Sequence, residues 1–123
     1  MTIVARSLMV PIALKAAETL EQQGVSCEVI DPRTIRPLDI NTIVESVKKT
    51  NRLVVAEESH PICGVNAEIS AQIMERAFDY LDAPVKRVSG ADVPMPYAKN
   101  LENLAIPDVD RIIAAVREVA YLD

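Results

Sequence analysis

The chain has 123 residues, enough for one domain, with half of them apolar and only one Phe, three Tyr and no Trp. Its formal net charge of −5 argues against nucleic-acid and anionic-membrane partners, because phosphate binding requires a basic face. No run of eighteen apolar residues occurs, and the two cysteines lack CxxC spacing, so we expect no membrane contact and reduced thiols.

The first half of the chain predicts two strands and two helices in alternation. Residues 2–5 (TIVA) and 26–31 (SCEVID) are strand-like runs. Apolar residues at helical spacing lie between them and end at Gly24, which suits a left-handed helix cap. These apolar residues are Val10, Ala13, Leu14, Ala17 and Leu20. Asp39 is a candidate N-cap for a second helix that ends near Thr50.

The second half repeats this alternation. Residues 52–57 (RLVVAE) and 84–89 (PVKRVS) predict the third and fourth strands. Residues 64–81 predict a helix with a wide apolar face, which we expect to be largely covered. A last helix begins at Asp108, an N-cap candidate. Its expected inward residues are Val109, Ile112, Ile113, Val116 and Ala120.

Strands that alternate with helices favour parallel pairing through right-handed crossovers. We therefore predict an α/β fold, a three-layer α/β/α domain whose four parallel strands run in the order 2-1-3-4. The strand order then reverses between strands one and three, and a crevice opens there beside residues 5–9 and 57–64. Ligands of such sheets bind at this position, so it is the first place to look for chemistry.

The residues around the expected crevice do not form a convincing catalytic, cofactor or metal site. The turn after the first strand reads ARSLMVP, without the glycines of a nucleotide-binding turn or the acidic residues of a phosphoacceptor domain. Glu57 and Glu58 point to opposite faces of a strand, so we expect one paired and one solvated carboxylate. His60 and Cys63 follow these carboxylates, so a catalytic cysteine activated by His and Glu is conceivable. Proximity in a loop does not establish the hydrogen-bonded geometry that such a nucleophile requires.

Residues 90–107 (GADVPMPYAKNLENLAIP) hold three prolines and predict a loop without helix or strand. Apolar residues within it argue against disorder, so it is either a functional pinned loop or a crossover pressed on its own domain. Arg33 and Arg36, in the stretch RTIRPLD, follow the second strand at the same sheet edge. They could bind an anion, but pairing with Asp92 or reaching across an interface is favoured.

Several segments resemble, in order, the carboxy-terminal domain of the beta subunit of pyruvate dehydrogenase, in the transketolase-like superfamily. The segments are VIDPRTIRPLD, KKTNRLVVAEE, GVNAEI, FDYLDAPVKRVSGADVPMPYAKNLE and IPDVDRIIAAV, and they cover essentially the whole chain. TIRPLD and ADVPMPYA carry most of the specificity. The chain has Ser59 and Asn66 where the family usually has glycine, which puts the shape of the crevice loop in question.

The resemblance implies one domain over residues 1–123, without the upstream pyrimidine-binding domain and without an antiparallel edge strand before Thr2. In the complete α2β2 enzyme, thiamine diphosphate and magnesium are held elsewhere, so we expect this chain alone to bind neither. The implied partners are the alpha subunit, a second beta subunit and dihydrolipoyl acetyltransferase, in a bacterial cytoplasm or mitochondrial matrix. A branched-chain 2-oxoacid dehydrogenase beta subunit, a stand-alone α/β ligand-binding module and a small hydrolase remain alternatives.

Two sets of interface residues follow from the resemblance and the composition together. The first set is expected to pack toward another subunit and consists of Arg33, Arg36, Asp92, Pro94, Met95, Pro96 and Tyr97. The second is an acidic edge where helix ends gather at the strand starts. It consists of Asp79, Asp82 and Asp123, which we expect to dock the small basic domain of the acyltransferase.

Overall fold

The four predicted strands form one fully parallel sheet in a computed structural model that describes residues 1–122. The strands are β1 (Thr2–Ala5), β2 (Glu28–Ile30), β3 (Leu53–Ala56) and β4 (Lys86–Val88), in the order β2-β1-β3-β4. Val4 of β1 lies between Ile30 of β2 and Val55 of β3. The predicted order 2-1-3-4 is confirmed, and β2 and β4 are the edge strands.

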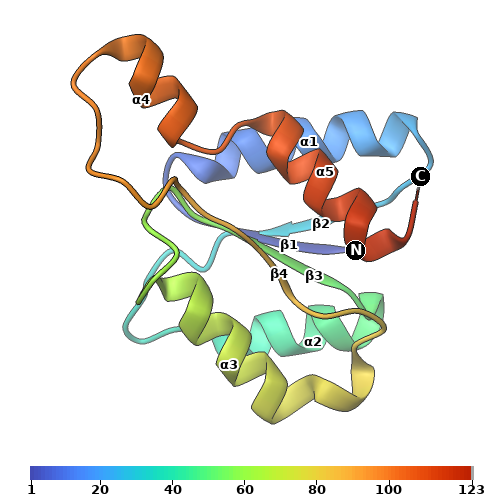
Figure 1. Cartoon of the computed structure of the whole chain (residues 1–123). Coiled ribbons are helices and arrows are strands. Elements are labelled where there is room, and N and C mark those ends of the chain that lie inside the picture. The colour runs from blue at the N-terminus through green and yellow to red at the C-terminus, as the bar shows by residue number, and fades with distance from the viewer. Residues whose placement is uncertain (123) are drawn as a thin grey trace.

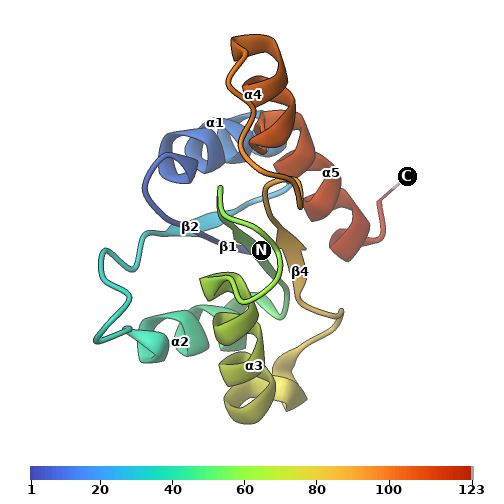
Figure 2. The same ribbon diagram turned by 60° about the vertical axis from the view of Figure 1, so that its left-hand side comes forward.

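Helices cover both faces of this sheet and give three layers (Figures 1 and 2). The helices α1 (Met9–Gln22) and α5 (Val109–Ala120) pack together on one face. The helices α2 (Ile40–Thr50) and α3 (Val65–Ala77) pack together on the other. No helix in the described part of the chain is long and apolar enough to cross a membrane.

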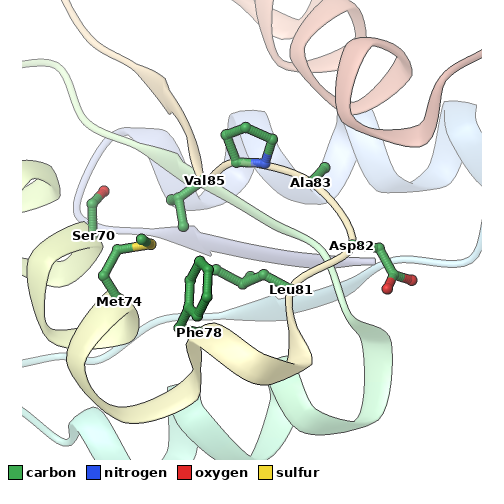
Figure 3. A pocket seen from close by; sticks show the side chains of 8 residues that line it. Ser70, Met74, Phe78, Leu81, Asp82, Ala83 and Val85 are labelled. Atoms are coloured by element: carbon green, nitrogen blue, oxygen red, sulfur yellow. The ribbon is translucent and has the colours of Figure 1, made fainter.

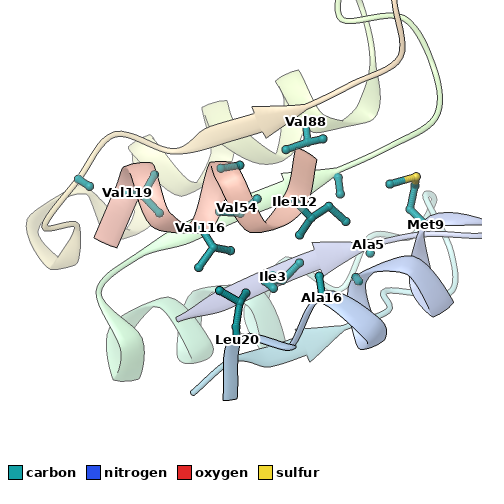
Figure 4. Packing of buried hydrophobic residues seen from close by; sticks show 14 residues of the cluster. Ile3, Ala5, Met9, Ala16, Leu20, Val54, Val88, Ile112, Val116 and Val119 are labelled. Atoms are coloured by element: carbon teal, nitrogen blue, oxygen red, sulfur yellow. The ribbon is translucent and has the colours of Figure 1, made fainter. Parts of the chain in front are cut away.

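Alternation along the strands divides the core into two aliphatic clusters. Ile3 and Val54 face α1 and α5, where Figure 4 shows them with Ile112 and Val116. Val4 and Val55 face α2 and α3. None of the four aromatic residues contributes to either core, because Phe78, Tyr80, Tyr97 and Tyr121 are all exposed.

Local signals at the helix ends are confirmed in three places. The Asp39 carboxylate accepts hydrogen bonds from the Thr42 hydroxyl (2.6 Å) and backbone N–H (3.1 Å), and these bonds lower its pKa. Asp108 caps α5 by accepting from the Arg111 backbone N–H (2.9 Å). Gly24 has a φ of +82°, the left-handed conformation expected after α1.

Three details of the helix predictions are wrong. Leu14 is half exposed, because the buried stripe of α1 runs through Ala13, Ala16 and Leu20. In α5 the buried stripe includes Val119, and Ala120 lies outside it. The predicted helix over residues 64–81 ends at Ala77, and a 3₁₀ turn, η1 (Phe78–Tyr80), follows.

The proline-rich segment also contains a helix that we did not predict, α4 (Lys99–Ala105). The prolines lie at positions 94, 96 and 107, so residues 98–106 are free of the residue that blocks helix formation. Figures 1 and 2 show α4 and the chain leading to it standing away from the three-layer body. We call residues 92–104 the arm.

Candidate functional site

The crevice between β1 and β3 is occupied by the protein's own polar side chains. Arg6 follows β1 and donates from Nη2 to Oε2 of Glu57, which follows β3, at 2.7 Å. Glu57 is only 2% exposed. Asn66, at the start of α3, donates its backbone N–H to Glu57 Oε2 (3.3 Å) and its Nδ2 to the Val55 carbonyl (3.0 Å). This crevice network ties β1, β3 and α3 together.

The crevice residues do not fit a bound thiamine diphosphate with its magnesium ion. A side chain at Gly64 would overlap Oε1 of Glu57, so backbone and carboxylate already fill this space. Arg6 already pairs with Glu57, so its guanidinium is not free to bind a diphosphate at this point. Among residues 1–122, no group of three or more His, Cys, Asp or Glu side chains could hold a metal ion.

The other residues of the crevice loop point outward. Glu58 is exposed whereas Glu57 is buried and paired, which confirms the predicted division between the two carboxylates. Nε2 of His60 lies 2.8 Å from the Val93 carbonyl oxygen in the arm. Cys63 is exposed and Cys27 is half-buried, and neither thiol is bonded to the other.

The expected strain at Ser59 and Asn66 is absent, since neither has a positive φ. Asn66 instead lies in the first turn of α3, where its side chain serves the crevice network. Left-handed backbone occurs at Ser7 (φ 51°) and Cys63 (φ 57°), one in each turn beside the crevice. The two crevice turns therefore do depart from ordinary backbone geometry, but at other residues than expected.

The arm leaves and rejoins the domain at one narrow neck. The Ala91 N–H donates to the Ala105 carbonyl (2.9 Å), which brings the two ends of the arm together. The Gly90 N–H donates to the Ser59 carbonyl (2.9 Å), and the His60 ring reaches Val93. The crevice loop therefore holds the arm in place.

The arm exposes apolar side chains in an unusual concentration. Tyr97 is fully exposed, and Leu104 is 77% exposed. The remaining exposed large apolar residues of the arm are Val93, Met95 and Leu101. Exposed apolar groups scattered singly are ordinary, whereas the arm carries five large ones within 13 residues.

The stretch RTIRPLD does not hold the arm, contrary to our expectation. Arg33 lies 3.6 Å from the Asp31 carboxylate instead of pairing with Asp92, and the Arg33 backbone N–H also bonds to Asp31 (3.0 Å). Thr34 Oγ1 donates to the Pro37 carbonyl (2.7 Å), so the stretch braces itself. Figures 1 and 2 show this segment turning toward α2, whereas the arm lies on the side of α1 and α5. Arg36 is exposed.

The predicted acidic edge also carries cations and aromatic rings from neighbouring elements. Asp79 lies in the turn η1 and Asp82 follows it, both exposed. The Lys48 ammonium lies 5.6 Å from the Tyr80 ring centre, and the Arg52 guanidinium lies 5.6 Å from that of Tyr121. The edge is therefore mixed in charge and rich in aromatic groups. Asp123, the third predicted residue of this edge, lies outside the described residues.

A hollow of about 480 Å³ opens beside Asp82 (Figure 3). It is lined mainly by apolar side chains of α3, η1 and the segment before β4. Met74 and Phe78 are 47% and 61% exposed there, so the predicted covering is wrong for this part of the helix face, although it holds for Ile69, Ile73 and Ala77, which are buried. We call it the α3 groove; its lining residues are Ser70, Met74, Phe78, Leu81, Asp82, Ala83, Pro84 and Val85.

Comparison with protein families gives a match to the transketolase C-terminal domain over residues 1–112. The chain belongs to this family. A solved structure described as "Split gene transketolase, inactive beta4 tetramer" superimposes on 98% of the chain and 38% of its own length, with a TM-score of 0.83 and 30% identity. The resemblance inferred from TIRPLD and ADVPMPYA is confirmed.

Similar full-length proteins place this transketolase C-terminal domain in a larger context. The pyruvate dehydrogenase E1 component subunit beta of Rickettsia bellii is 58% identical over 121 residues, covering 98% of the chain and 37% of that protein. The mitochondrial subunit beta-1 of Arabidopsis thaliana is 58% identical over 120 residues, covering 98% of the chain and 33% of that protein. The chain thus spans about a third of the length of these relatives.

Sequence reasoning missed the α3 groove and the contact between His60 and the arm. A signal for the groove was present, because Met74, Phe78 and Leu81 were recognised as one helix face. Nothing in the local sequence shows whether a second apolar stripe of a helix is covered, since that depends on neighbouring elements. The partner of His60 is 33 residues away and only the fold brings it near.

Proposed function

We propose that the chain is the assembly domain of the beta subunit of an acetyl-transferring pyruvate dehydrogenase. That enzyme decarboxylates pyruvate with thiamine diphosphate and passes the acetyl group to the lipoyl group of an acyltransferase. Identities of 52–58% over 98% of the chain to beta subunits of this enzyme support the proposal. The cellular setting that follows is a bacterial cytoplasm or a mitochondrial matrix, as for these relatives.

The observation that carries the assembly role is the exposed apolar arm. Pro94, Met95, Pro96 and Tyr97 lie on a projecting segment whose base is fixed by hydrogen bonds and whose tip is solvent-exposed. Rigid prolines lower the entropy lost when such a segment binds. Tyr and Met are also enriched at protein interfaces. We assign this surface to contacts within an α2β2 assembly of alpha and beta subunits.

The second assigned surface is the edge around Asp82, where the acyltransferase would dock. The α3 groove supplies apolar area beside Asp82, and the exposed Asp79 follows Phe78 of the groove in the turn η1, which suits a small basic domain. The Tyr121 hydroxyl donates to the Asp82 carbonyl (3.4 Å), so the end of α5 lies at the same edge. Because the basic groups Lys48 and Arg52 lie nearby, a partner would have to match the positions of both the positive and the negative charges at this edge.

The assembly role is tested in a full-length beta subunit that carries this domain, co-expressed with an alpha subunit. A Met95→Ala, Tyr97→Ala double variant should shift the mass measured by light scattering from α2β2 toward smaller species. Leu14→Ala removes an exposed leucine from α1 and should leave the assembly intact. An unchanged α2β2 mass in the double variant would contradict the assembly role of the arm.

The docking role needs a separate measurement on the intact α2β2 assembly. Asp82→Lys should weaken binding of the acyltransferase's subunit-binding domain, and more strongly at low than at high salt, because salt screens exposed charges. Glu58→Lys is the matched control, since it makes the same charge change at an exposed residue at the opposite edge of the sheet. Equal affinity of the Asp82 variant and the parent at both salt concentrations would reject the docking role.

A stand-alone ligand-binding module is disfavoured because the crevice predicted to receive a ligand is filled by the Arg6–Glu57 pair. A small hydrolase is disfavoured because the His60 ring bonds to the arm backbone and not to Cys63. A branched-chain 2-oxoacid dehydrogenase shares the domain, and the two are separated by measuring decarboxylation of pyruvate against a branched 2-oxoacid in the assembled enzyme.

A further inference from the structure

Three cations gather at the outer edge of the sheet, next to the neck of the arm. Lys86 and Arg87 belong to the edge strand β4, and Arg111 comes from the first turn of α5. Together with Pro61, Ser89 and Gly90 they line a hollow of about 320 Å³. A neighbouring hollow of about 240 Å³ shares the same three cations. This concentration stands out in a chain with a net charge of −5.

Among the described residues, two of these three charges have no carboxylate partner. The Lys86 ammonium pairs with Glu118 at 2.6 Å. Arg87 Nη1 donates to the Pro61 carbonyl (3.2 Å) and Arg111 Nη2 to the Ser89 carbonyl (2.8 Å). Within residues 1–122 neither guanidinium forms an ion pair with an acidic group. The carbonyls therefore position both guanidinium groups without neutralising them, and each retains further N–H donors.

Ser89 adds an unsatisfied polar group to the same hollow. The residue is only 7% exposed, and its hydroxyl makes no hydrogen bond to any described residue. A buried hydroxyl without a partner is unfavourable, so an acceptor in the hollow would stabilise it. Ser89 also follows β4 directly, and the carboxyl ends of parallel strands are where α/β sheets bind ligands.

We propose that this hollow binds a phosphate group, carried by inorganic phosphate or by a small phosphate monoester. After Lys86 and Glu118 offset each other, two positive charges remain, which matches the dianion. Guanidinium groups bind phosphate oxygens through paired N–H donors. The Ser89 hydroxyl, which has almost no accessible surface as it stands, would become a further donor on rotation toward the phosphate. The hollow thus combines charge, directional donors and a buried polar group on three separate segments of the chain.

The direct test is an NMR titration of the ¹⁵N-labelled 123-residue chain with inorganic phosphate at constant ionic strength. The Ser89 amide and the Nε–Hε signals of Arg87 and Arg111 should shift and saturate with a Kd of about 1 mM, a reasonable affinity for so small a ligand. Glycerol 3-phosphate, titrated in parallel, distinguishes the sources, because tighter binding by about tenfold assigns the site to a monoester and equal binding assigns it to free phosphate. Acetate should produce no saturating shift; saturation by acetate at the same concentrations would overturn the phosphate assignment.

Variants connect binding to the named residues. Arg87→Met and Arg111→Met should each weaken phosphate binding by about tenfold or more, through loss of a charge-assisted donor pair. Arg87→Lys and Arg111→Lys keep the charge and the fold, and they should still weaken binding because the paired donors are lost. Arg76→Met is the matched control, an exposed cation on α3 across the sheet. Equal weakening in the control, or unchanged affinity in all four site variants, would overturn the proposal.

Discussion

The crevice and the arm lie at the same edge of the sheet, but the side chains of the crevice contact one another whereas many of those of the arm face solvent. In the crevice, Arg6 and Glu57 pair internally and are covered by α3. In the arm, Tyr97 and Leu104 extend into solvent. The crevice between β1 and β3 is thus filled by an internal ion pair, whereas the projecting segment leaves its apolar side chains in solvent.

One loop connects these two regions. Glu57 begins the loop and belongs to the crevice network. Further along the same loop, the Ser59 carbonyl accepts from the Gly90 N–H and the His60 ring contacts the Val93 carbonyl, and these two contacts hold the neck of the arm. The loop that holds the neck of the arm thus begins at one member of a buried ion pair. Removing that pair should affect both regions, whereas changes at the tip of the arm should affect binding alone.

The largest expected effect comes from breaking the crevice network. Glu57→Ala should lower the free energy of unfolding by about 3–5 kcal/mol, because it leaves the Arg6 guanidinium largely buried without its partner. Chemical denaturation measures this change. Glu58→Ala is the matched control, since the neighbouring carboxylate is exposed and its loss should change stability by less than about 0.5 kcal/mol. Similar losses in both variants would show that the crevice network contributes no more to stability than an exposed carboxylate does.

A smaller effect is expected from crowding the same network without removing a charge. Gly64→Ala would place Cβ against the Glu57 carboxylate and 2.8 Å from the His60 carbonyl oxygen. The required shifts should destabilise the domain by about 1–3 kcal/mol, as is usual for overpacking. Calorimetric melting measures the loss. Combining Gly64→Ala with Glu57→Ala should cost less than the sum of the two, because the clash with the carboxylate is removed and only the contact with the His60 carbonyl oxygen remains; strict additivity would contradict this steric account.

The tip of the arm should contribute almost nothing to folding. Tyr97→Ala and Leu104→Ser, made separately, should each change the free energy of unfolding by less than about 0.5 kcal/mol, because both side chains are already solvated. Urea denaturation of the chain provides the measurement. A loss above about 1 kcal/mol from either variant would indicate that the arm packs on its own domain, the alternative left open by its composition.

The smallest expected effect is a difference in alkylation rate between the two cysteines, which reports how well each thiol is shielded from solvent. Burial raises the pKa of the Cys27 thiol, so less of it is thiolate at a given pH, whereas Cys63 in the crevice loop is exposed. With iodoacetamide at pH 8, Cys63 should react about tenfold faster or more, since only the thiolate is the nucleophile. Peptide mass spectrometry follows both sites. In denaturant the two rates should converge, and equal rates in the native protein would contradict the difference in cover.

The fold was predictable because its signals are local and repeated. Asp39 and Asp108 each precede an apolar periodic run, and both cap the expected helices. The α4 helix was missed because the prolines around it dominated the pattern of the whole segment. The early end of α3 at Ala77 was missed because the apolar spacing of Met74, Phe78 and Leu81 continues past it.

The candidate sites were predictable only in part. Composition indicated that residues 90–107 had a role beyond connection, and the opposite directions of Glu57 and Glu58 followed from strand geometry. The pairing of Arg33 with Asp92 was wrong because nothing in the sequence says that RTIRPLD turns toward α2. The cation cluster brings Arg111 next to Lys86 and Arg87, which lie more than twenty positions earlier in the chain, so no local pattern indicated it.

The sequence by itself determined the order of strands and helices, the parallel sheet and the family, because apolar periodicity, caps and motifs such as ADVPMPYA act over short spans of chain. Only the tertiary structure decided which surfaces remain open. Burial of Glu57, exposure of Met74 and Phe78, and the gathering of cations beside Ser89 depend on what the neighbouring elements cover. Solvent exposure is a property of the assembled layers, and no segment carries it alone.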